Sequence, residues 1–177
     1  MKIRSLTLPL LALAAAVALA GCGGSSKASG IVLAPSAGET QASVPATPKP
    51  PPALAKKPTV TVPTGPAPAK LVTKDLVPGT GQTVKAGQTV TVNYVGVLYK
   101  NGKEFDSSWK TGQPATFPLT PGGVIQGWVQ GIPGMKVGGR RELIIPANLA
   151  YGKAGRPPTI PANSPLVFVV DLLSISS

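Results

Sequence analysis

Histidine is absent from the 177-residue sequence, and cysteine occurs once, at position 22. Without histidine the chain cannot form a Ser-His-Asp or Cys-His catalytic group or the common zinc ligand sets. A single cysteine has no disulfide partner within the chain, so a folded domain must be stabilised by a packed core. The sequence therefore disfavours covalent hydrolysis and metal catalysis, and we expect no metal or other cofactor.

Acidic residues are also few, with 6 Asp and Glu against 17 Lys and Arg, and a net charge of +11 would favour anionic partners. The basic side chains are scattered, however, and no basic run alternates with aromatic residues as in nucleic-acid-binding segments. A phosphate-binding loop of the form G-x-x-x-x-G-K-[ST] is missing as well. We therefore expect neither a nucleic acid nor a nucleotide cofactor as a ligand.

An apolar stretch at residues 6–20 follows two basic side chains and comes just before Cys22. It is shorter than the roughly 20 residues that span a bilayer as a helix, and its arrangement is typical of an export signal. Residues 19–22 (LAGC) resemble a bacterial lipobox, in which the cysteine is lipidated and becomes the N-terminus; a plain membrane anchor is the alternative. We predict a lipoprotein signal peptide at residues 1–21, with lipidation of Cys22 on the extracytoplasmic side of a bacterial membrane.

Residues 23–70 are rich in proline, alanine, serine and threonine and lack periodic apolar positions. This composition favours a coil with polyproline segments over a packed core. We predict that residues 22–70 comprise the lipidated cysteine and a disordered tether, with a docking segment for an aromatic-lined partner as the alternative. The change in composition after residue 70 predicts one folded domain at residues 71–177.

Alternating apolar and polar residues begin in this C-terminal part. Residues 89–99 (TVTVNYVGVLY) are rich in β-branched and aromatic residues and predict a long strand, and the Asn101-Gly102 pair predicts a hairpin turn after it. Further strands are predicted at residues 71–77, 140–145 and 166–173, and a short helix at residues 124–131. An antiparallel sheet needs a cover for its apolar face, which one short helix could provide. The sequence therefore predicts an α+β fold.

All eight aromatic side chains lie between Tyr94 and Phe168. Aromatic side chains usually belong to a core, and any one of them alone would be assigned to it. Four short motifs nevertheless occur in the order typical of one family: YVG at 94–96, GKEFDSS at 102–108, VIQGW at 124–128 and AYG at 150–152. With these motifs, residues 71–175 resemble the FK506-binding-protein (FKBP) type of peptidyl-prolyl cis/trans isomerase.

The resemblance implies a half-open antiparallel β-sheet wrapped around one short α-helix. It also implies a hydrophobic pocket with three candidate catalytic residues: Trp128 as the floor, Asp106 at the edge, and Tyr151 donating from its hydroxyl to a ligand carbonyl. A solvated hairpin charge at Asp106 and a core role for Tyr151 remain open as alternatives. The candidate substrate-binding residues are Tyr94, Phe105, Val124, Ile125, Ile160 and Phe168.

The sequence departs from the family pattern around this pocket. Ala115 replaces an aromatic that is common two positions before Phe117, and Arg156 replaces a histidine of some members. The Pro157-Pro158 pair and Thr159 also change the flap. We expect these departures to affect substrate preference and the affinity for FK506- or rapamycin-type macrolides, which the resemblance makes candidate ligands.

The activity that the resemblance implies requires no nucleophile. Rotation about an X-Pro bond breaks no covalent bond and crosses a barrier of about 18–20 kcal/mol. We therefore predict a monomeric isomerase that acts on X-Pro bonds of exported polypeptides by apolar desolvation and shape fit. A non-catalytic, proline-binding surface scaffold or adhesion lipoprotein is the alternative.

Overall fold

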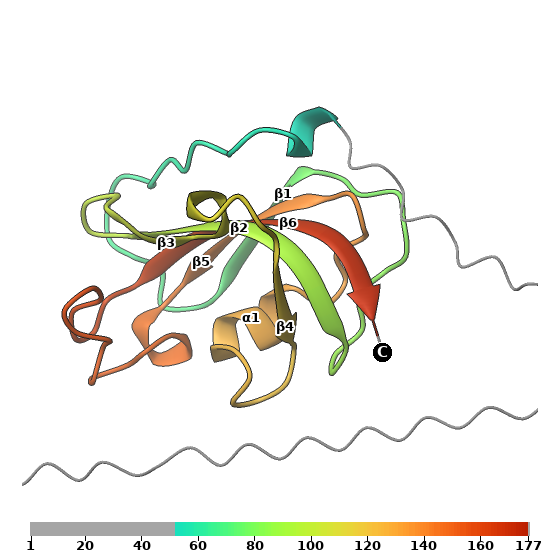
Figure 1. Ribbon diagram of the computed structural model, residues 1–177. Helices are drawn as coiled ribbons and strands as arrows, with labels where there is room; N and C mark the ends of the chain where they lie inside the picture. The colour runs from blue at the N-terminus through green and yellow to red at the C-terminus, as the bar shows by residue number, and fades with distance from the viewer. Residues whose placement is uncertain (1–51, 177) are drawn as a thin grey trace, which may run out of the picture. The chain divides into compact units, whose positions relative to one another are not determined.

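A computed structural model of the protein describes residues 52–176 (Figure 1). The predicted signal peptide, Cys22 and the first part of the predicted tether lie outside these residues. Six strands form one antiparallel sheet in the order β1-β5-β6-β2-β3, and β4 pairs with β2 off this path. The strands are β1 (Val72–Val77), β2 (Thr89–Leu98), β3 (Glu104–Ser107), β4 (Ala115–Pro118), β5 (Arg140–Ile145) and β6 (Leu166–Ser176). The predicted α+β fold, with an antiparallel sheet around one short helix, is confirmed.

The sheet is organised around β2, which pairs with β3, β4 and β6. The alternating sequence of β2 explains this position, because nearly every side chain along it is buried or partly buried. Four of the six strands were predicted by their ranges, and the hairpin turn was predicted to lead toward Glu104 and Phe105, where β3 begins. The remaining strand, β4, was not predicted, since four residues are too few to show periodicity. The predicted turn is present, and Gly102 adopts the positive φ of 67° that favours glycine.

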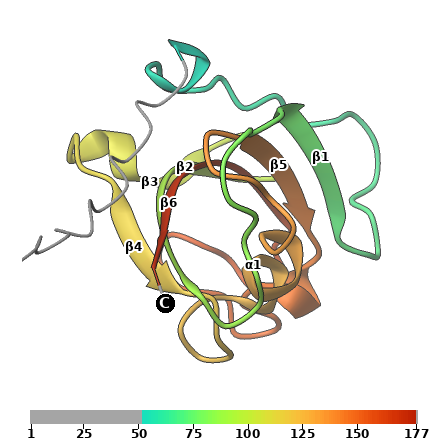
Figure 2. The ribbon, with the colours of Figure 1, turned by 90° about the vertical axis from the view of Figure 1, so that its right-hand side faces the viewer.

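The one α-helix of residues 52–176, α1 (Gln126–Gly131), lies inside the curve of the sheet (Figure 2). It begins two residues later than predicted, because Ile125 keeps an extended backbone as the N-cap. A Cβ atom at Gly127 would lie 2.4 Å from the side chain of Ile145, so glycine allows the helix to approach β5 closely. This approach places Trp128 against the concave face of the sheet.

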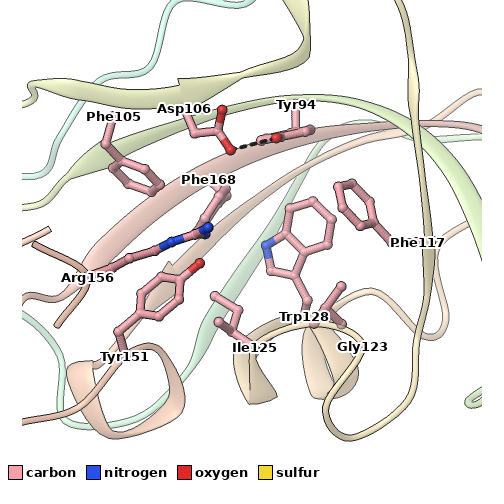
Figure 3. A pocket seen from close by; sticks show the side chains of 11 residues that line it. Tyr94, Phe105, Asp106, Phe117, Gly123, Ile125, Trp128, Tyr151, Arg156 and Phe168 are labelled. Atoms are coloured by element: carbon pink, nitrogen blue, oxygen red, sulfur yellow. Dashed lines mark hydrogen bonds between the residues drawn. The ribbon is translucent and has the colours of Figure 1, made fainter. Parts of the chain in front are cut away.

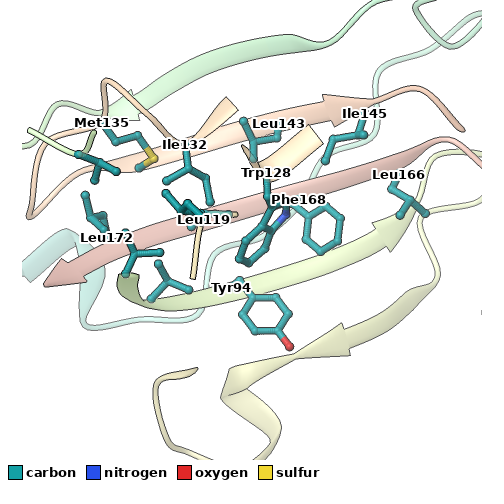
Figure 4. Packing of buried hydrophobic residues seen from close by; sticks show 14 of the residues in the cluster. Tyr94, Leu119, Trp128, Ile132, Met135, Leu143, Ile145, Leu166, Phe168 and Leu172 are labelled. Carbon is teal, nitrogen blue, oxygen red and sulfur yellow. The ribbon is translucent and has the colours of Figure 1, made fainter. Parts of the chain in front are cut away.

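Apolar side chains cover both faces of the sheet. The inner cluster lies between the sheet and α1, and it includes Trp128, Ile132, Leu143, Phe168 and Leu172 (Figure 4). The outer cluster lies on the opposite face because side chains alternate along each strand. It consists of Val95, Val97, Tyr99, Ile144 and Val167.

Residues 52–70, called the strap below, precede β1 and pack against the outer cluster. The strap includes a short 3₁₀ helix, η1 (Pro52–Leu54), whose Leu54 is only 2% exposed. Val60 and Val62 contact the outer cluster, and the strap runs outside the sheet in Figures 1 and 2.

Polar contacts also hold the strap in place. Lys57 Nζ lies 2.7 Å from Glu104 Oε2, and the Tyr99 hydroxyl donates to the carbonyl of Pro66 at 3.3 Å. The structure thus differs from the predicted tether over residues 52–70, since apolar side chains interspersed among prolines still bury area against the sheet. Within residues 52–176, no helix is long and apolar enough to cross a membrane.

Candidate active site

A pocket of about 180 Å³ opens over the indole of Trp128 on the inner face (Figure 3). Eight of the nine predicted site residues line it, and three others join them. The predicted residues are Tyr94, Phe105, Asp106, Val124, Ile125, Trp128, Tyr151 and Phe168, and the additional ones are Phe117, Gly123 and Arg156. The ninth, Ile160, lines an adjoining cavity of about 270 Å³. The structure therefore brings all the predicted pocket residues together.

Different elements contribute the walls and the floor. Tyr94 comes from the middle of β2, Phe105 and Asp106 come from β3, and Phe168 comes from β6. Trp128 rises from α1, while Tyr151 follows the short 3₁₀ helix η3 (Ala147–Leu149). The pocket is thus a product of the sheet topology, since neighbouring strands and the helix bring together residues distant in sequence.

Edge-to-face aromatic packing fixes the indole of Trp128. The ring centroids of Tyr94, Phe117 and Phe168 lie 5.5, 5.3 and 5.4 Å from it, with interplanar angles of 82° to 84°. Such contacts contribute about 0.5–1.5 kcal/mol each beyond the area that they bury. Trp128 is only 3% exposed, and it lines the open pocket as a rigid apolar floor. The sequence argument did not assign Phe117 to the pocket, although its place on β4 beside β2 brings it there.

Gly96 explains why two phenylalanine rings meet at the side of the pocket. A Cβ atom at this position would lie 2.7 Å from ring carbons of both Phe105 and Phe168. Those rings pack edge to face with their centroids 5.4 Å apart. The glycine in the motif at residues 94–96 is therefore required for packing on β2.

Asp106 and Tyr94 form the polar edge of the pocket. The Tyr94 hydroxyl donates to Asp106 Oδ2 at 2.7 Å, and the backbone N–H of Ser107 donates to Asp106 Oδ1 at 2.9 Å. Burial, followed by the hydrogen bond to Asp106, raises the pKa of Tyr94 well above its ordinary value. Tyr94 consequently stays a neutral donor, and Asp106 lies at the pocket edge, where its side chain is exposed to solvent and also accepts two hydrogen bonds.

Hydrogen-bond donors also face the pocket. The Tyr151 hydroxyl points into it (Figure 3), and the side chain is only partly buried, which argues against a simple core role. Ile125 directly precedes α1, where backbone N–H groups have no partner within the helix.

The described part of the chain offers no grouping of three His, Cys, Asp or Glu side chains that could hold a metal ion. The pocket lining is mainly aromatic and includes polar side chains at Asp106, Tyr151 and Arg156, so it can bind, desolvate and hydrogen-bond a peptide.

Comparisons with known proteins agree with this geometry. The family model described as FKBP-type peptidyl-prolyl cis-trans isomerase matches residues 80–173. The FK506-binding protein of Streptomyces anulatus is 53% identical over 121 residues, which cover 68% of this chain and 98% of the relative. A probable FK506-binding protein of Corynebacterium glutamicum is 50% identical over 119 residues, covering 67% and 98%.

A solved structure is also similar to this chain. The crystal structure of a peptidyl-prolyl cis-trans isomerase from Pseudomonas syringae matches with a TM-score of 0.56 and 35% identity, covering 71% of this chain and 86% of that one. Since the family model spans more than half of the sequence and near-complete relatives share half of their residues with it, this chain belongs to the FKBP-type peptidyl-prolyl cis-trans isomerase family.

Proposed function

We propose that this isomerase accelerates X-Pro rotation in exported polypeptides, with the proline ring placed over the indole of Trp128. The observation that carries the proposal is the open aromatic pocket above a fixed indole floor. Family membership supports the reaction, and the export signal predicted at residues 1–21 supports the choice of clients. The roles assigned to individual residues below are part of the same proposal.

The proposed mechanism begins with the amide itself. A planar X-Pro amide is stabilised by a dipolar resonance form that water supports, and the twisted transition state has largely lost that resonance. Transfer into an apolar pocket therefore penalises the planar amide more than the twisted one, so the pocket binds the transition state preferentially. Each 1.36 kcal/mol of this difference accelerates rotation about tenfold.

Polar groups at the rim orient the peptide. We assign to the Tyr151 hydroxyl and the Ile125 N–H the role of donors to substrate carbonyls on either side of the proline. The hydrogen bond from Tyr94 to Asp106 holds the phenol at the edge, so that its ring and not its hydroxyl faces the proline. The substrate is thereby positioned by donors while the proline ring meets an apolar surface.

The direct test is a measurement of cis/trans exchange in a short Leu-Pro peptide by two-dimensional NMR, with the purified full-length chain in mild detergent. We expect exchange that increases linearly with enzyme concentration and that FK506 suppresses by occupying the pocket. An exchange rate equal to that of buffer, measured with folded protein, would contradict the enzymatic proposal and favour a non-catalytic, proline-binding scaffold.

The proposed location is the extracytoplasmic face of a bacterial membrane, with Cys22 as the lipidated residue. The LAGC sequence at residues 19–22 and the preceding apolar stretch support it. Metabolic labelling with an alkyne fatty acid in a bacterial host tests it, with Cys22→Ser as the matched variant. We expect label and membrane association for the wild type alone; equal labelling of both proteins would refute lipidation at this cysteine.

We also propose that the protein acts as a monomer. The strap covers the outer cluster, and among the large apolar side chains of residues 52–176 only Val72 and Leu76 are exposed, at 42% and 41%. A stable dimer of this size class usually buries a larger apolar surface. Light scattering during gel filtration tests this expectation, and a mass of twice the chain would contradict it.

A further inference from the structure

The cavity that adjoins the aromatic pocket differs from it in character. It measures about 270 Å³ and shares Phe105, Asp106, Tyr151 and Arg156 with the pocket. Thr159 and Ile160 complete its lining, while Trp128 and Phe168 do not take part. This second cavity, called the annex below, is therefore less aromatic than the pocket. A residue next to a proline bound over Trp128 would lie in or near the annex.

Arg156 projects into this region from a tightly fixed backbone. Its N–H donates to the carbonyl of Ile160 at 2.7 Å, and its own carbonyl accepts from the N–H groups of Thr159 at 3.1 Å and Ile160 at 2.9 Å. Ile160 is itself only 2% exposed and anchors the loop in the inner cluster. Because these backbone hydrogen bonds join both ends of the loop, they fix the position of the Arg156 Cα atom beside the annex.

The loop also depends on Gly155, which has a positive φ of 63°. A Cβ atom there would lie 2.5 Å from the carbonyl oxygen of Ile160. The backbone conformation next to Arg156 therefore requires glycine at position 155. Figure 3 shows the guanidinium beside the Tyr151 hydroxyl.

Arg156 forms no ion pair with a carboxylate of the described residues, although Asp106 lines the same cavity. The ion pairs found among residues 52–176 involve Lys57, Lys110, Arg140 and Arg141, and none includes Arg156. Asp106 is the acidic group of the annex, yet each of its oxygens already accepts a hydrogen bond, from Tyr94 and from Ser107. The annex therefore presents an exposed guanidinium without an ion-pair partner, beside a carboxylate that two hydrogen bonds hold at the cavity edge.

We propose that the annex is a binding subsite for an acidic side chain that flanks the substrate proline, with Arg156 as its specificity-determining residue. A guanidinium binds a carboxylate through two parallel hydrogen bonds, which an amide side chain cannot reproduce with the same strength. Thr159 adds a hydroxyl donor, and Phe105 and Ile160 supply apolar walls against which the stem of an acidic side chain can pack. The inference goes beyond the family activity, since it concerns which X-Pro sequences this chain favours.

The experiment compares peptides that differ only in charge. Exchange is measured by two-dimensional NMR, without a coupling protease, for Ala-Glu-Pro-Phe and Ala-Gln-Pro-Phe amides and for a second pair with Glu or Gln after the proline. The readout is the ratio of kcat/KM for Glu over Gln, obtained with the full-length protein and with Arg156→Gln. We expect the ratio to fall about two- to fivefold in the variant for at least one pair, as for an ion pair at an exposed arginine.

Turnover of the Gln peptides verifies that each variant is folded, and the ratio is insensitive to a general loss of activity. Lys153→Gln serves as the matched control, because it removes a cation from the same loop at a position that lines neither cavity. Arg156→Glu should lower the ratio further than Arg156→Gln. The proposal is overturned if Arg156→Gln leaves the ratio unchanged for both pairs, or if Lys153→Gln lowers it equally.

Discussion

The apolar clusters on the two faces of the sheet are covered by different kinds of structure. The inner face is covered by α1 and contains every aromatic ring that lines the pocket, with a cavity left open above Trp128. The outer face carries a smaller, mainly aliphatic cluster that the strap closes. The comparison indicates that aromatic rings are concentrated where the surface is open, while an irregular segment suffices as cover where the sheet only has to exclude water.

Replacing the tryptophan on each face in turn should give the largest difference between the faces in stability and turnover. Trp128→Ala removes the floor that three rings contact, and we expect it to cost about 3–5 kcal/mol in the free energy of unfolding and to reduce turnover at least tenfold. Trp109→Ala acts on the outer side, where Trp109 packs partly buried against the outer cluster. For Trp109→Ala we expect a smaller loss of stability and turnover within about twofold of wild type.

Urea unfolding and NMR exchange, measured on the same samples, separate the two effects. Comparable losses of turnover in both variants, at equal folded fraction, would show that the faces are not functionally distinct.

Removal of the strap tests whether the outer face needs its cover. A chain that begins at residue 71 loses the buried Leu54 and the contacts of Val60 and Val62. We expect unfolding to require about 2–4 kcal/mol less, because the lost burial is partly offset by the entropy that the strap no longer forfeits. A chain that begins at residue 52 is the control. Identical urea midpoints for the two chains would mean that the strap contacts do not stabilise the sheet.

A smaller effect is expected for the hydroxyl of Tyr151. Tyr151→Phe keeps the ring and removes one hydrogen bond to substrate, which contributes about 0.5–1.5 kcal/mol and corresponds to roughly a two- to tenfold loss of kcat/KM. The melting temperature should stay within about 1–2 °C of wild type, since the hydroxyl points into the pocket. A large fall in melting temperature without a change in turnover per folded molecule would assign Tyr151 to the core.

The smallest effect concerns acid sensitivity. A hydrogen bond from Arg141 lowers the pKa of Asp75 below its ordinary value despite some desolvation. The stabilisation is therefore present at neutral pH and is lost as the pH falls below about 3.8 and through the lowered pKa. Since Asp75 is half exposed, Asp75→Asn should cost less than about 1 kcal/mol at pH 7. Urea midpoints at pH 7 and pH 2 check this, and a difference from wild type that is as large at pH 2 would argue against the charge as its cause.

Sequence patterns revealed the long strands more readily than the short elements. Alternation over ten residues identified β2, while β3 and β4 are too short for such a pattern and are defined by pairing with β2. The strap was not recognised, because Val60 and Val62 stand among prolines and their burial depends on the sheet face that they contact. Local periodicity cannot report a contact that only tertiary structure creates.

The candidate site was predicted mainly through the order of its motifs, not through any single residue. Tyr94, Trp128 and Phe168 each look like core residues, and they are buried; only their joint presence at one cavity distinguishes a site from a core. Phe117 was missed because nothing in its own segment separates a pocket ring from a packing ring. Whether Arg156 forms an ion pair could not be predicted from the sequence either, since it depends on the positions of the five carboxylates of the domain.

Arg140 and Arg141 are adjacent in sequence yet serve opposite sides of the sheet. Arg140 binds the fully buried Asp171 and donates to the carbonyl of Lys56 in the strap at 2.9 Å, whereas Arg141 binds Asp75 and donates to the carbonyl of Gly131 at the end of α1 at 2.9 Å. Two adjacent residues of β5 therefore connect the sheet to the strap on one side and to α1 on the other. A pull on the chain at residue 52 would therefore be shared between β5, through Arg140, and β3, through the Lys57–Glu104 pair.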